Sequence, residues 1–234
     1  MELNADFSVR AAVHAARLPW VPSPMPGVER RMLDRIGGEL ARATSIVRYA
    51  PRSRFSAHTH GGGEEFLVLE GVFQDEHGDY GPGCYVRNPP TSAHSPGSET
   101  GCVIFVKLWQ FLPEDRVHVC VDTSKRPYRP SAERPGVQVM PLYQDSSEKV
   151  RLERWEPDAS ITLPLRGGGE FLVLDGTFEE SAERFEMHSW LRLPPGSTLE
   201  ARAGRTGCTL WVKTGHLAHV GRLPFTRSPT AFGN

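Results

Sequence analysis

Four side chains in the first half of the 234-residue sequence have the types and spacing of a metal site. His58 and His60 are separated by one residue, Glu64 follows shortly after, and His94 comes later in the chain. Alternate side chains of an extended strand point to the same side, so we expect the imidazoles of His58 and His60 about 6 to 7 Å apart.

This ligand set indicates the class of metal. Three imidazole nitrogens and one carboxylate oxygen suit Fe(II), Zn(II), Mn(II), Ni(II) or Cu(II), whereas Ca(II) and Mg(II) prefer oxygen ligands alone. We therefore predict one divalent transition metal ion, held by His58, His60, Glu64 and His94. Iron and zinc are the first candidates, and manganese and nickel also fit. The pattern assigns no catalytic residue.

Short strands and sharp turns must bring these residues together. Gly61 to Gly63 separate the histidines from Glu64, and because glycine tolerates positive φ they can return the glutamate to the same face on the next strand. The 23 glycines and 20 prolines favour many short strands over helices. Residues 5–16 fit either a short helix or an edge strand. Segments rich in β-branched or aromatic residues predict strands at 45–49, 65–69, 84–87 and 102–108.

The chain also repeats itself. The sequence GGGEEFLVLEG at 61–71 returns as GGGEFLVLDG at 167–176, and TGCVIFVK at 100–107 returns as TGCTLWVK at 206–213. The repeat unit runs from about 27 to 111 and again from about 136 to 217. We predict an N-terminal metal-binding domain at 1–112, a proline-punctuated linker at 113–135, in which 117–121 could form a strand, and a C-terminal domain at 136–234.

The second repeat is expected to lack the metal ligands. Aligning the glycine runs, with one residue deleted, puts Pro164 at the position of His58, Arg166 at that of His60 and Leu199 at that of His94. Glu64 falls at the deletion. We interpret this repeat as a structural domain, with the alternative that Arg166 and Arg192 line a pocket for an anion.

Composition limits the classes of function. With 27 Lys and Arg against 28 Asp and Glu, the formal charge is −1, which argues against a nucleic-acid partner. Four cysteines without a C-x-x-C pair argue against a zinc ribbon or a redox dithiol. Gly61 to Gly63 lack the Lys-Ser/Thr of a phosphate loop, so we expect no nucleotide or other organic cofactor site. The sequence shows neither a long apolar segment nor a signal peptide, so we expect a cytoplasmic protein without a membrane partner.

These residues resemble the motifs of the cupins. His58, His60, Glu64 and Gly71 match the first motif as H-x-H-x3-E-x6-G, and Gly83, Pro89 and His94 match the second, G-x5-P-x-G-x2-H-x3-N. Three positions depart from the motifs: Arg52 and Thr91 stand where glycines belong, and Ser98 replaces the final asparagine. The resemblance implies an all-β chain of two double-stranded β-helix (jelly-roll) barrels in tandem, the second without metal.

Segments at 18–20, 26–28, 65–76 and 83–90 look more narrowly like the ChrR-type cupins. Proteins that resemble this subfamily include the zinc-binding cupin domain of the ChrR anti-sigma factor and iron dioxygenases that cleave dihydroxyacetophenones or β-diketones. The helical zinc domain with which that anti-sigma factor grips its partner carries a His-x3-Cys-x2-Cys motif, and His14 has no such cysteines beside it. Inhibition of a sigma factor in that way is therefore not expected.

Two functions follow from the resemblance. One is a dioxygenase-type enzyme acting on a small diketone- or hydroxyketone-like substrate, and the other is a non-catalytic zinc-binding sensor or regulatory cupin. The expected partner in both is a small molecule. Cupins often form homodimers through sheet edges, and the second repeat can supply the same cover within one chain. Phe55, Tyr85 and Phe105 are candidate pocket residues and Lys107 or Arg48 candidate anchors, without assigned roles.

A histidine site predicts a pH-dependent metal affinity. Binding requires neutral imidazoles, so bound metal should decrease as the pH falls below about 6.5, the unperturbed histidine pKa. Metal retention after dialysis, measured between about pH 5 and pH 8, checks this expectation, and a flat profile would contradict it.

Overall fold

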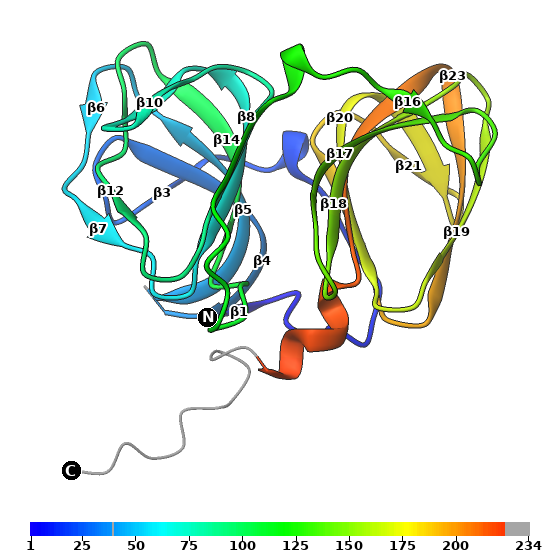
Figure 1. Cartoon of the computed structure of the whole chain (residues 1–234), viewed down its shortest axis with the longest axis horizontal. Coiled ribbons are helices and arrows are strands. Elements are labelled where there is room, and N and C mark those ends of the chain that lie inside the picture. Colours follow the sequence, from blue (N-terminus) through cyan, green and yellow to red (C-terminus); the bar gives the residue numbers. More distant parts are fainter. Residues whose placement is uncertain (39, 223–234) are drawn as a thin grey trace. The chain divides into compact units, whose positions relative to one another are not determined.

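The computed structural model describes residues 1–38 and 40–222, and almost all of its regular structure is β-strand. Contacts divide the chain into two units, each a curled set of antiparallel strands (Figure 1). Unit 1 comprises Met1–Ala5, Pro19–Ser124 and the described residues from 220 on, and unit 2 comprises Asp6–Leu18 and Lys125–His219. The predicted all-β architecture of two units is confirmed.

Unit 1 contains an eight-stranded sheet in the order β1-β4-β5-β14-β8-β11-β15, with β3 on β4, a four-stranded sheet, β10-β9-β13-β6, and the pair β12-β7. The strands predicted at 45–49, 65–69, 84–87 and 102–108 lie within β5, β8, β11 and β14. The bounds are β1 (Glu2–Leu3), β3 (Val21–Pro22), β4 (Val28–Gly37), β5 (Ala41–Tyr49), β6 (Ser53–Arg54), β7 (His58–Thr59), β8 (Glu64–Gly71), β9 (Phe73–Asp75), β10 (Gly78–Tyr80), β11 (Cys84–Asn88), β12 (Ala93–His94), β13 (Gly97–Ser98), β14 (Cys102–Leu108) and β15 (Val119–Asp122).

Unit 2 is built on a nine-stranded sheet in the order β16-β17-β18-β23-β20-β22-β2, with β19 on β23 and β21 on β20. Its bounds are β2 (Ala11–His14), β16 (Arg129–Pro130), β17 (Val137–Gln144), β18 (Lys149–Trp155), β19 (Ser160–Leu165), β20 (Gly169–Glu180), β21 (Glu183–Phe185), β22 (Ser189–Leu193) and β23 (Ser197–Thr214), and the short 3₁₀ helices of the chain are η1 (Ala15–Arg17), η2 (Thr123–Lys125) and η3 (His216–Arg222).

One long strand of unit 2 corresponds to three short ones in unit 1. β23 runs through 18 residues, whereas the matching part of unit 1 is divided into β12, β13 and β14. Pro96 and Gly101 stand in the interruptions. Proline cannot donate a ladder hydrogen bond, so Pro96 breaks a continuous strand. The positive φ of Gly101, +82°, does not by itself do so, because its counterpart Gly207 has φ +77° inside β23. The chain around the predicted metal ligands is therefore less regular than its counterpart.

Each unit contains one strand from the segment that comes just before the main body of the other unit in the sequence. β2 pairs with β22 of unit 2 although it lies before Pro19, where the main body of unit 1 begins. β15 lies before the body of unit 2 but pairs with β11 of unit 1. The registers correspond, because Ala11 faces Arg192 as Val119 faces Arg87.

Side chains hold β2 in unit 2. His14 contacts Glu183 through Nε2 and Ser189 through Nδ1, both at 2.9 Å, and Arg10 forms ion pairs with Glu180 and Glu183. The open choice between a helix and an edge strand for residues 5–16 is thereby resolved in favour of a strand followed by η1.

The predicted domain boundaries were drawn along the sequence, and the contacts divide the chain differently. Residues 6–18, predicted to belong to the N-terminal domain, lie in unit 2. The predicted linker at 113–135 carries β15, η2 and β16, and its first part, up to Ser124, belongs to unit 1. A leading strand that pairs with a distant partner leaves no local sequence signal, which explains the difference.

The barrel interiors hold the two hydrophobic cores. In unit 1 the cluster includes Phe66, Val68, Phe73, Ile104 and Val106, which alternate along their strands with residues on the opposite face. In unit 2 the cluster is larger and includes the fully buried side chains listed here: Phe171, Val173, Phe185, Leu191, Leu199, Leu210 and Val212.

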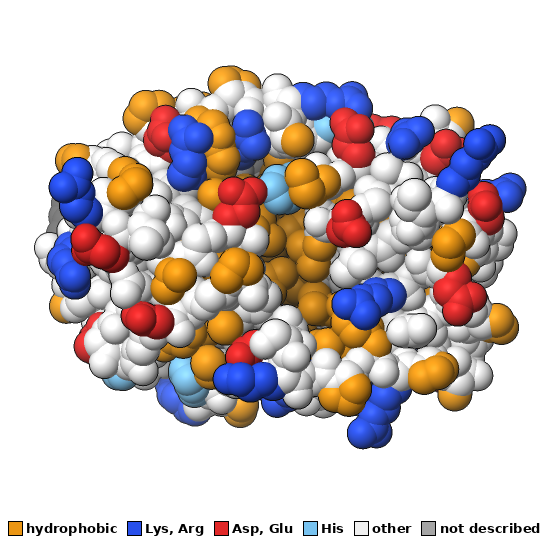
Figure 2. Space-filling model, turned by 90° about the horizontal axis from the view of Figure 1, so that it is seen from above, with side chains coloured by type: hydrophobic (Ala, Val, Ile, Leu, Met, Phe, Trp, Pro, Cys, Tyr) orange, Lys and Arg blue, Asp and Glu red, His pale blue; other side chains and the backbone are white. Residues whose placement is uncertain are grey.

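Charged side chains of both signs are interspersed on the face of the molecule drawn in Figure 2, as the near-zero net charge leads one to expect. Within the described residues, no helix has the length and hydropathy that crossing a membrane would require.

The exchanged strands predict a reciprocal effect of proline substitutions. Replacing both Ala12 and Val13 by proline removes two backbone N–H groups of β2, including the one that donates to β22. This double substitution should expose β22 to hydrogen exchange and leave β11 protected. Replacing Cys120 and Val121 in β15 should do the reverse. Deuterium uptake of peptides covering 189–193 and 84–88 measures both effects. Equal uptake by the two peptides in either variant would contradict this arrangement.

Candidate metal centre

Three histidines converge at one end of unit 1. β7 and β12 are antiparallel, and their register places His94 directly opposite His58. The ring centroids are 4.9 Å apart for His58 and His60, 5.2 Å for His58 and His94, and 4.7 Å for His60 and His94. One ring nitrogen from each residue lies within 4.8 Å of the other two. The structure thus brings together the three histidines that the sequence analysis singled out.

Glu64 approaches two of these imidazoles. It begins β8, and its Oε2 atom lies 3.5 Å from Nε2 of His60 and 3.5 Å from Nε2 of His94. The Asn88 side chain donates a hydrogen bond of 3.4 Å to the same oxygen. The carboxylate therefore lies on the buried side of the cluster, while His58 is exposed.

Glycines shape the turn between His60 and Glu64, as predicted, but for two different reasons. Gly63 has φ +75°, the left-handed conformation that favours glycine. Gly61 and Gly62 are needed for space, because a Cβ atom on them would lie 2.7 Å and 2.3 Å from the ring of Trp109. The indole packs directly on the backbone of the turn and fixes the path that leads to Glu64.

The motif departures keep the backbone conformation of the glycines that they replace. Arg52 has φ +61° and Thr91 has φ +78°. A β-branched residue at positive φ is strained, and such strain persists only where the surrounding structure enforces it. The Thr91 backbone N–H donates to the carbonyl oxygen of His60 at 2.9 Å, so this strained turn supports a predicted ligand directly.

Protein partners orient two of the three imidazoles. Nδ1 of His94 lies 3.1 Å from Oδ2 of Asp75, and Nδ1 of His58 lies 3.2 Å from the carbonyl oxygen of Ser56. Carboxylate and carbonyl oxygens only accept, so both Nδ1 atoms carry a proton, and in the neutral imidazoles both Nε2 atoms then keep a lone pair. This tautomer is the one in which Nε2 can bind a metal.

Asp75 is a functional candidate that the sequence analysis missed. It ends β9, and its side chain is 4% exposed. Oδ1 accepts hydrogen bonds from the His77 backbone N–H at 2.8 Å and from the Tyr80 hydroxyl at 3.2 Å, which leaves Oδ2 directed at His94. The only signal for it in the sequence is its place in the polar stretch between Phe73 and Tyr80, where several acidic residues compete.

The surroundings shift the pKa values of the two buried histidines, His60 and His94, in opposite directions. Burial lowers the pKa of His60, against the opposing charge of Glu64. Burial also disfavours the charged form of His94, but the hydrogen bond that His94 donates to Asp75 and the charge of Glu64 outweigh it and raise the pKa of His94. In the metal-free protein, His94 therefore keeps its proton to a higher pH than His60, and its protonation competes first with metal binding as the pH falls.

The site fits a transition metal on its own geometry. Nε2 of His60 is buried and makes no hydrogen bond within the described residues. A buried ring nitrogen without a hydrogen-bond partner is costly, and a metal ion bound by this atom and the neighbouring Nε2 atoms would offset that cost. A donor set of imidazoles and one carboxylate suits borderline metals such as iron and zinc.

The candidate pocket residues divide between the two faces of the sheet. Tyr85 donates a hydrogen bond of 2.6 Å to Glu65, and Lys107 donates one of 2.9 Å to Thr44. Strand alternation puts these side chains, with Phe105, on the face opposite the core cluster that contains Phe66. Phe55 stays on the core side, with its ring 5.4 Å from that of Tyr49.

The structure corrects the alignment of the two repeats. In unit 2, Leu163 lies opposite Leu199, as His58 lies opposite His94 in unit 1. Leu163 and Leu165 therefore occupy the places of His58 and His60, and the prediction of Pro164 and Arg166 there is wrong.

The glycine in the turn after these residues explains why the sequence alignment was wrong. Gly168 has φ +74°, like Gly63, so the two match without a deletion and Gly169 takes the place of Glu64. The conclusion that unit 2 lacks all four predicted ligands remains.

Comparisons with known proteins agree with two copies of one fold. The sequence profile described as the ChrR cupin-like domain matches residues 8–112 and again 116–218. Each match begins near the exchanged strand, β2 or β15, so each sequence repeat includes the strand that it contributes to the other unit. No curated protein sequence matches the chain significantly.

Solved structures share the architecture at low identity. A candidate dioxygenase from Nostoc punctiforme matches with a TM-score of 0.70 at 15% identity, covering 98% of this chain and 87% of that one. The Ylba protein of E. coli matches with 0.68 at 11% identity, covering 90% and 93%. A variant of salicylate 1,2-dioxygenase from Pseudoaminobacter salicylatoxidans matches with 0.57 at 14% identity, covering 76% and 71%. Likenesses at this level of identity show the fold alone.

The geometry around Asp75 predicts a graded loss of metal affinity. Asp75→Leu removes the partner of His94 Nδ1 and should weaken metal binding by about 10- to 100-fold, whereas Asp75→Asn keeps an acceptor oxygen and should lose less. His94→Ala, which removes a proposed ligand, should lose most of the bound metal. Competition with a chelator of known affinity measures all three.

The matched control for this series is Asp79→Asn. Asp79 lies on the adjacent strand β10 and accepts a hydrogen bond of 2.7 Å from Gln74, away from the histidines. Its variant should bind metal like the parent protein. Unchanged affinity in Asp75→Leu would show that Asp75 does not position His94.

Proposed function

The chain belongs to the family of ChrR cupin-like domains, and from that premise we propose that unit 1 is a mononuclear metal-dependent enzyme of the dioxygenase type. Its substrate would be a small diketone- or hydroxyketone-like molecule. The observation that carries this proposal is the convergence of His58, His60 and His94 on one point, within 4.8 Å of one another.

The uneven exposure of the cluster supports a reactive site over a purely structural one. His60 and His94 are 6% and 3% exposed and Glu64 is 7% exposed, but His58 is exposed. Ligands buried on one side and accessible on the other leave an approach for a small molecule from the His58 side. Two of the structural neighbours are named as dioxygenases, one of them as a candidate, which is consistent with this chemistry in the same fold.

In this proposal the metal ion supplies Lewis-acid and redox chemistry when bound. The residues of the chain hold and orient it. Asp75 and Ser56 fix the tautomers of His94 and His58, and Asn88 donates to Glu64. Phe73, whose ring lies 5.8 Å from that of His94, forms an apolar wall and excludes water from the buried side.

The alternative is a non-catalytic zinc sensor or regulatory cupin. Glu64 lies 3.5 Å from two of the imidazoles and can complete a set of four protein ligands. A zinc ion with four protein ligands has no open position for chemistry and stabilises the fold. Metal content and oxygen consumption separate the two functions.

Oxygen uptake tests the proposal directly. Metal-free protein is first reconstituted with Fe(II) under anaerobic conditions. In aerated buffer, this iron form should consume dioxygen when 2,4-pentanedione or a dihydroxyacetophenone is added. His94→Ala should abolish that uptake. His118→Ala, which changes an exposed histidine outside the cluster, should behave like the parent protein. Tightly bound zinc after purification, together with no oxygen uptake by the iron form, would overturn the enzyme proposal and favour the sensor.

A further inference from the structure

The barrel mouth of unit 2 has a cavity where unit 1 has its histidines. This cavity has a volume of about 610 Å³, and Leu163 and Leu165, the counterparts of His58 and His60, line it together with Val139. Small-molecule pockets in proteins usually measure about 300 to 1,000 Å³ and combine apolar walls with a few polar groups. The second unit therefore retains a cavity of ligand size after the loss of its metal ligands.

Two arginines stand at the wall of this cavity. Arg151, Glu153 and Trp155 alternate along β18 and share one face, and Trp155 belongs to the core cluster of the barrel. Arg151 and Arg134 both line the cavity and are 12% and 14% exposed. Their guanidinium groups are thus largely buried and still accessible to a molecule in the cavity.

Glu153 holds the arginines in place. This carboxylate is fully buried and accepts two hydrogen bonds from Arg134, at 2.8 Å and 2.6 Å, one from Nε of Arg151 at 2.6 Å and one from the Trp155 indole at 2.7 Å. Burial opposes its charge, but the hydrogen bond from Arg134 and the charges of both arginines keep the pKa of Glu153 below its usual value. The carboxylate therefore stays ionised and fixes both guanidinium groups.

Two cations share this single carboxylate. A guanidinium has five N–H donors, of which Glu153 takes two from Arg134 and one from Arg151, and Thr214 accepts one more from Arg151 at 3.0 Å. Donors remain for a further acceptor on both residues.

The other charged groups of the lining do not remove the positive excess. Glu148 forms an ion pair with Lys213 at 2.9 Å. Asp145 is exposed and keeps its negative charge, while its Oδ1 accepts from the backbone N–H groups of Ser147 and Glu148. The remaining charged groups of the lining are also exposed: Glu133, Lys149 and Arg166. With Glu153 and Asp145 counted, the cavity therefore keeps an excess of one positive charge.

We propose that this cavity binds a small organic anion, with its carboxylate on Arg134 and Arg151 and its apolar part against Leu163, Leu165 and Val139. Guanidinium groups match carboxylate geometry, and a pair fixed beforehand by Glu153 loses little conformational entropy on binding. Arg166 lines the same cavity, whereas Arg192, its partner in the alternative raised from the sequence, is fully buried and donates to the carbonyl oxygen of Asp6. This site is separate from the metal centre and its proposed reaction.

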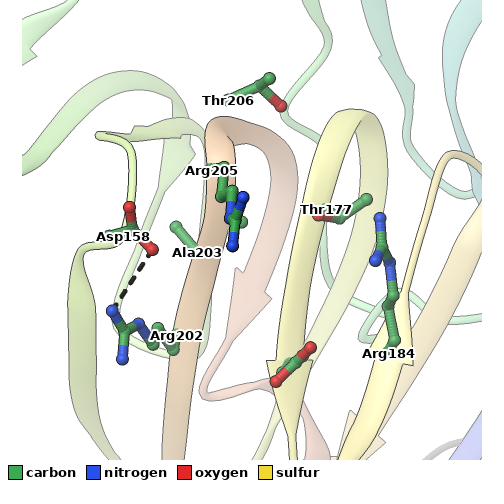
Figure 3. Close-up of a pocket in the computed structure, with 9 residues that line it drawn as sticks. Asp158, Thr177, Arg184, Arg202, Ala203, Arg205 and Thr206 are labelled. Carbon is green, nitrogen blue, oxygen red and sulfur yellow. Dashed lines mark hydrogen bonds and ion pairs between the residues drawn. The ribbon is translucent and has the colours of Figure 1, made fainter.

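A second hollow of unit 2, of about 400 Å³, lacks these features and provides a control (Figure 3). Its arginines, Arg184, Arg202 and Arg205, are all exposed, and Arg202 is paired with Asp158 at 3.3 Å. No leucine or valine lines it. An anion attracted by charge alone would bind to either place.

Calorimetric titration of the metal-loaded full chain tests the proposal with hexanoate as the probe. Hexanoate should bind, and hexan-1-ol, hexylamine and inorganic phosphate should each bind at least 10-fold more weakly, because each lacks either the carboxylate or the apolar part. Arg151→Leu leaves Glu153 with Arg134 and Trp155 and should weaken hexanoate binding at least 10-fold. Leu163→Trp keeps both arginines but fills the cavity, and should abolish binding.

Arg205→Leu is the matched control and should bind hexanoate like the parent chain. Thermal melting of each variant verifies that it is folded. Hexanoate that binds the parent chain no more tightly than hexan-1-ol or inorganic phosphate would overturn the proposal. So would an affinity that Leu163→Trp and Arg151→Leu both leave unchanged, since binding would then occur elsewhere, for example at the metal.

Discussion

The antiparallel register between two short strands is the constraint on which the metal centre depends. β7 and β12 contain only two residues each, yet their pairing places His58 opposite His94 and lets His60 follow on the same side. Side chains alternate with a period of two along a strand, so a shift of one residue would turn one histidine away from the others. The glycine turn packed against Trp109 and the strained turn at Thr91 both act on this register, because each fixes the chain on one side of His60.

The same register in unit 2 serves a different purpose. Leu163 and Leu199 occupy the paired positions, and a Cβ atom at Gly169 would lie 2.9 Å from Leu165, so the leucine takes the space that Glu64 fills in unit 1. Buried imidazoles and a buried carboxylate need a ligand to offset their desolvation, whereas leucines are stable in the core without one. The same backbone arrangement therefore holds a polar cluster in the first repeat and a cluster of leucines in the second.

Residue types and local spacing were enough to predict the fold class, the repeat and the side chains that converge. Prediction was weaker where the answer depended on long-range pairing. The sequence alone aligns the two glycine runs with Gly61 matched to Gly167. In the structure, the backbone conformation of Gly63 matches that of Gly168, and the cross-strand partners show the same alignment. Asp75 could not be selected among neighbouring acidic residues without knowing which one faces His94. The sequence indicated possible strands at 5–16 and 117–121, where β2 and β15 lie, but it gave no signal for the strands with which they pair.

The exchanged strand β2 has a consequence for the order in which the protein can fold during its synthesis. Ala11–His14 is synthesised about 180 residues before its partner, Ser189–Leu193. At about 5 to 20 residues per second, this interval is roughly 10 to 40 s. β15 follows its own partner, β11, much sooner. The first barrel can thus close before the second repeat has been synthesised, and the second must wait, with β2 unpaired, until β22 has been made.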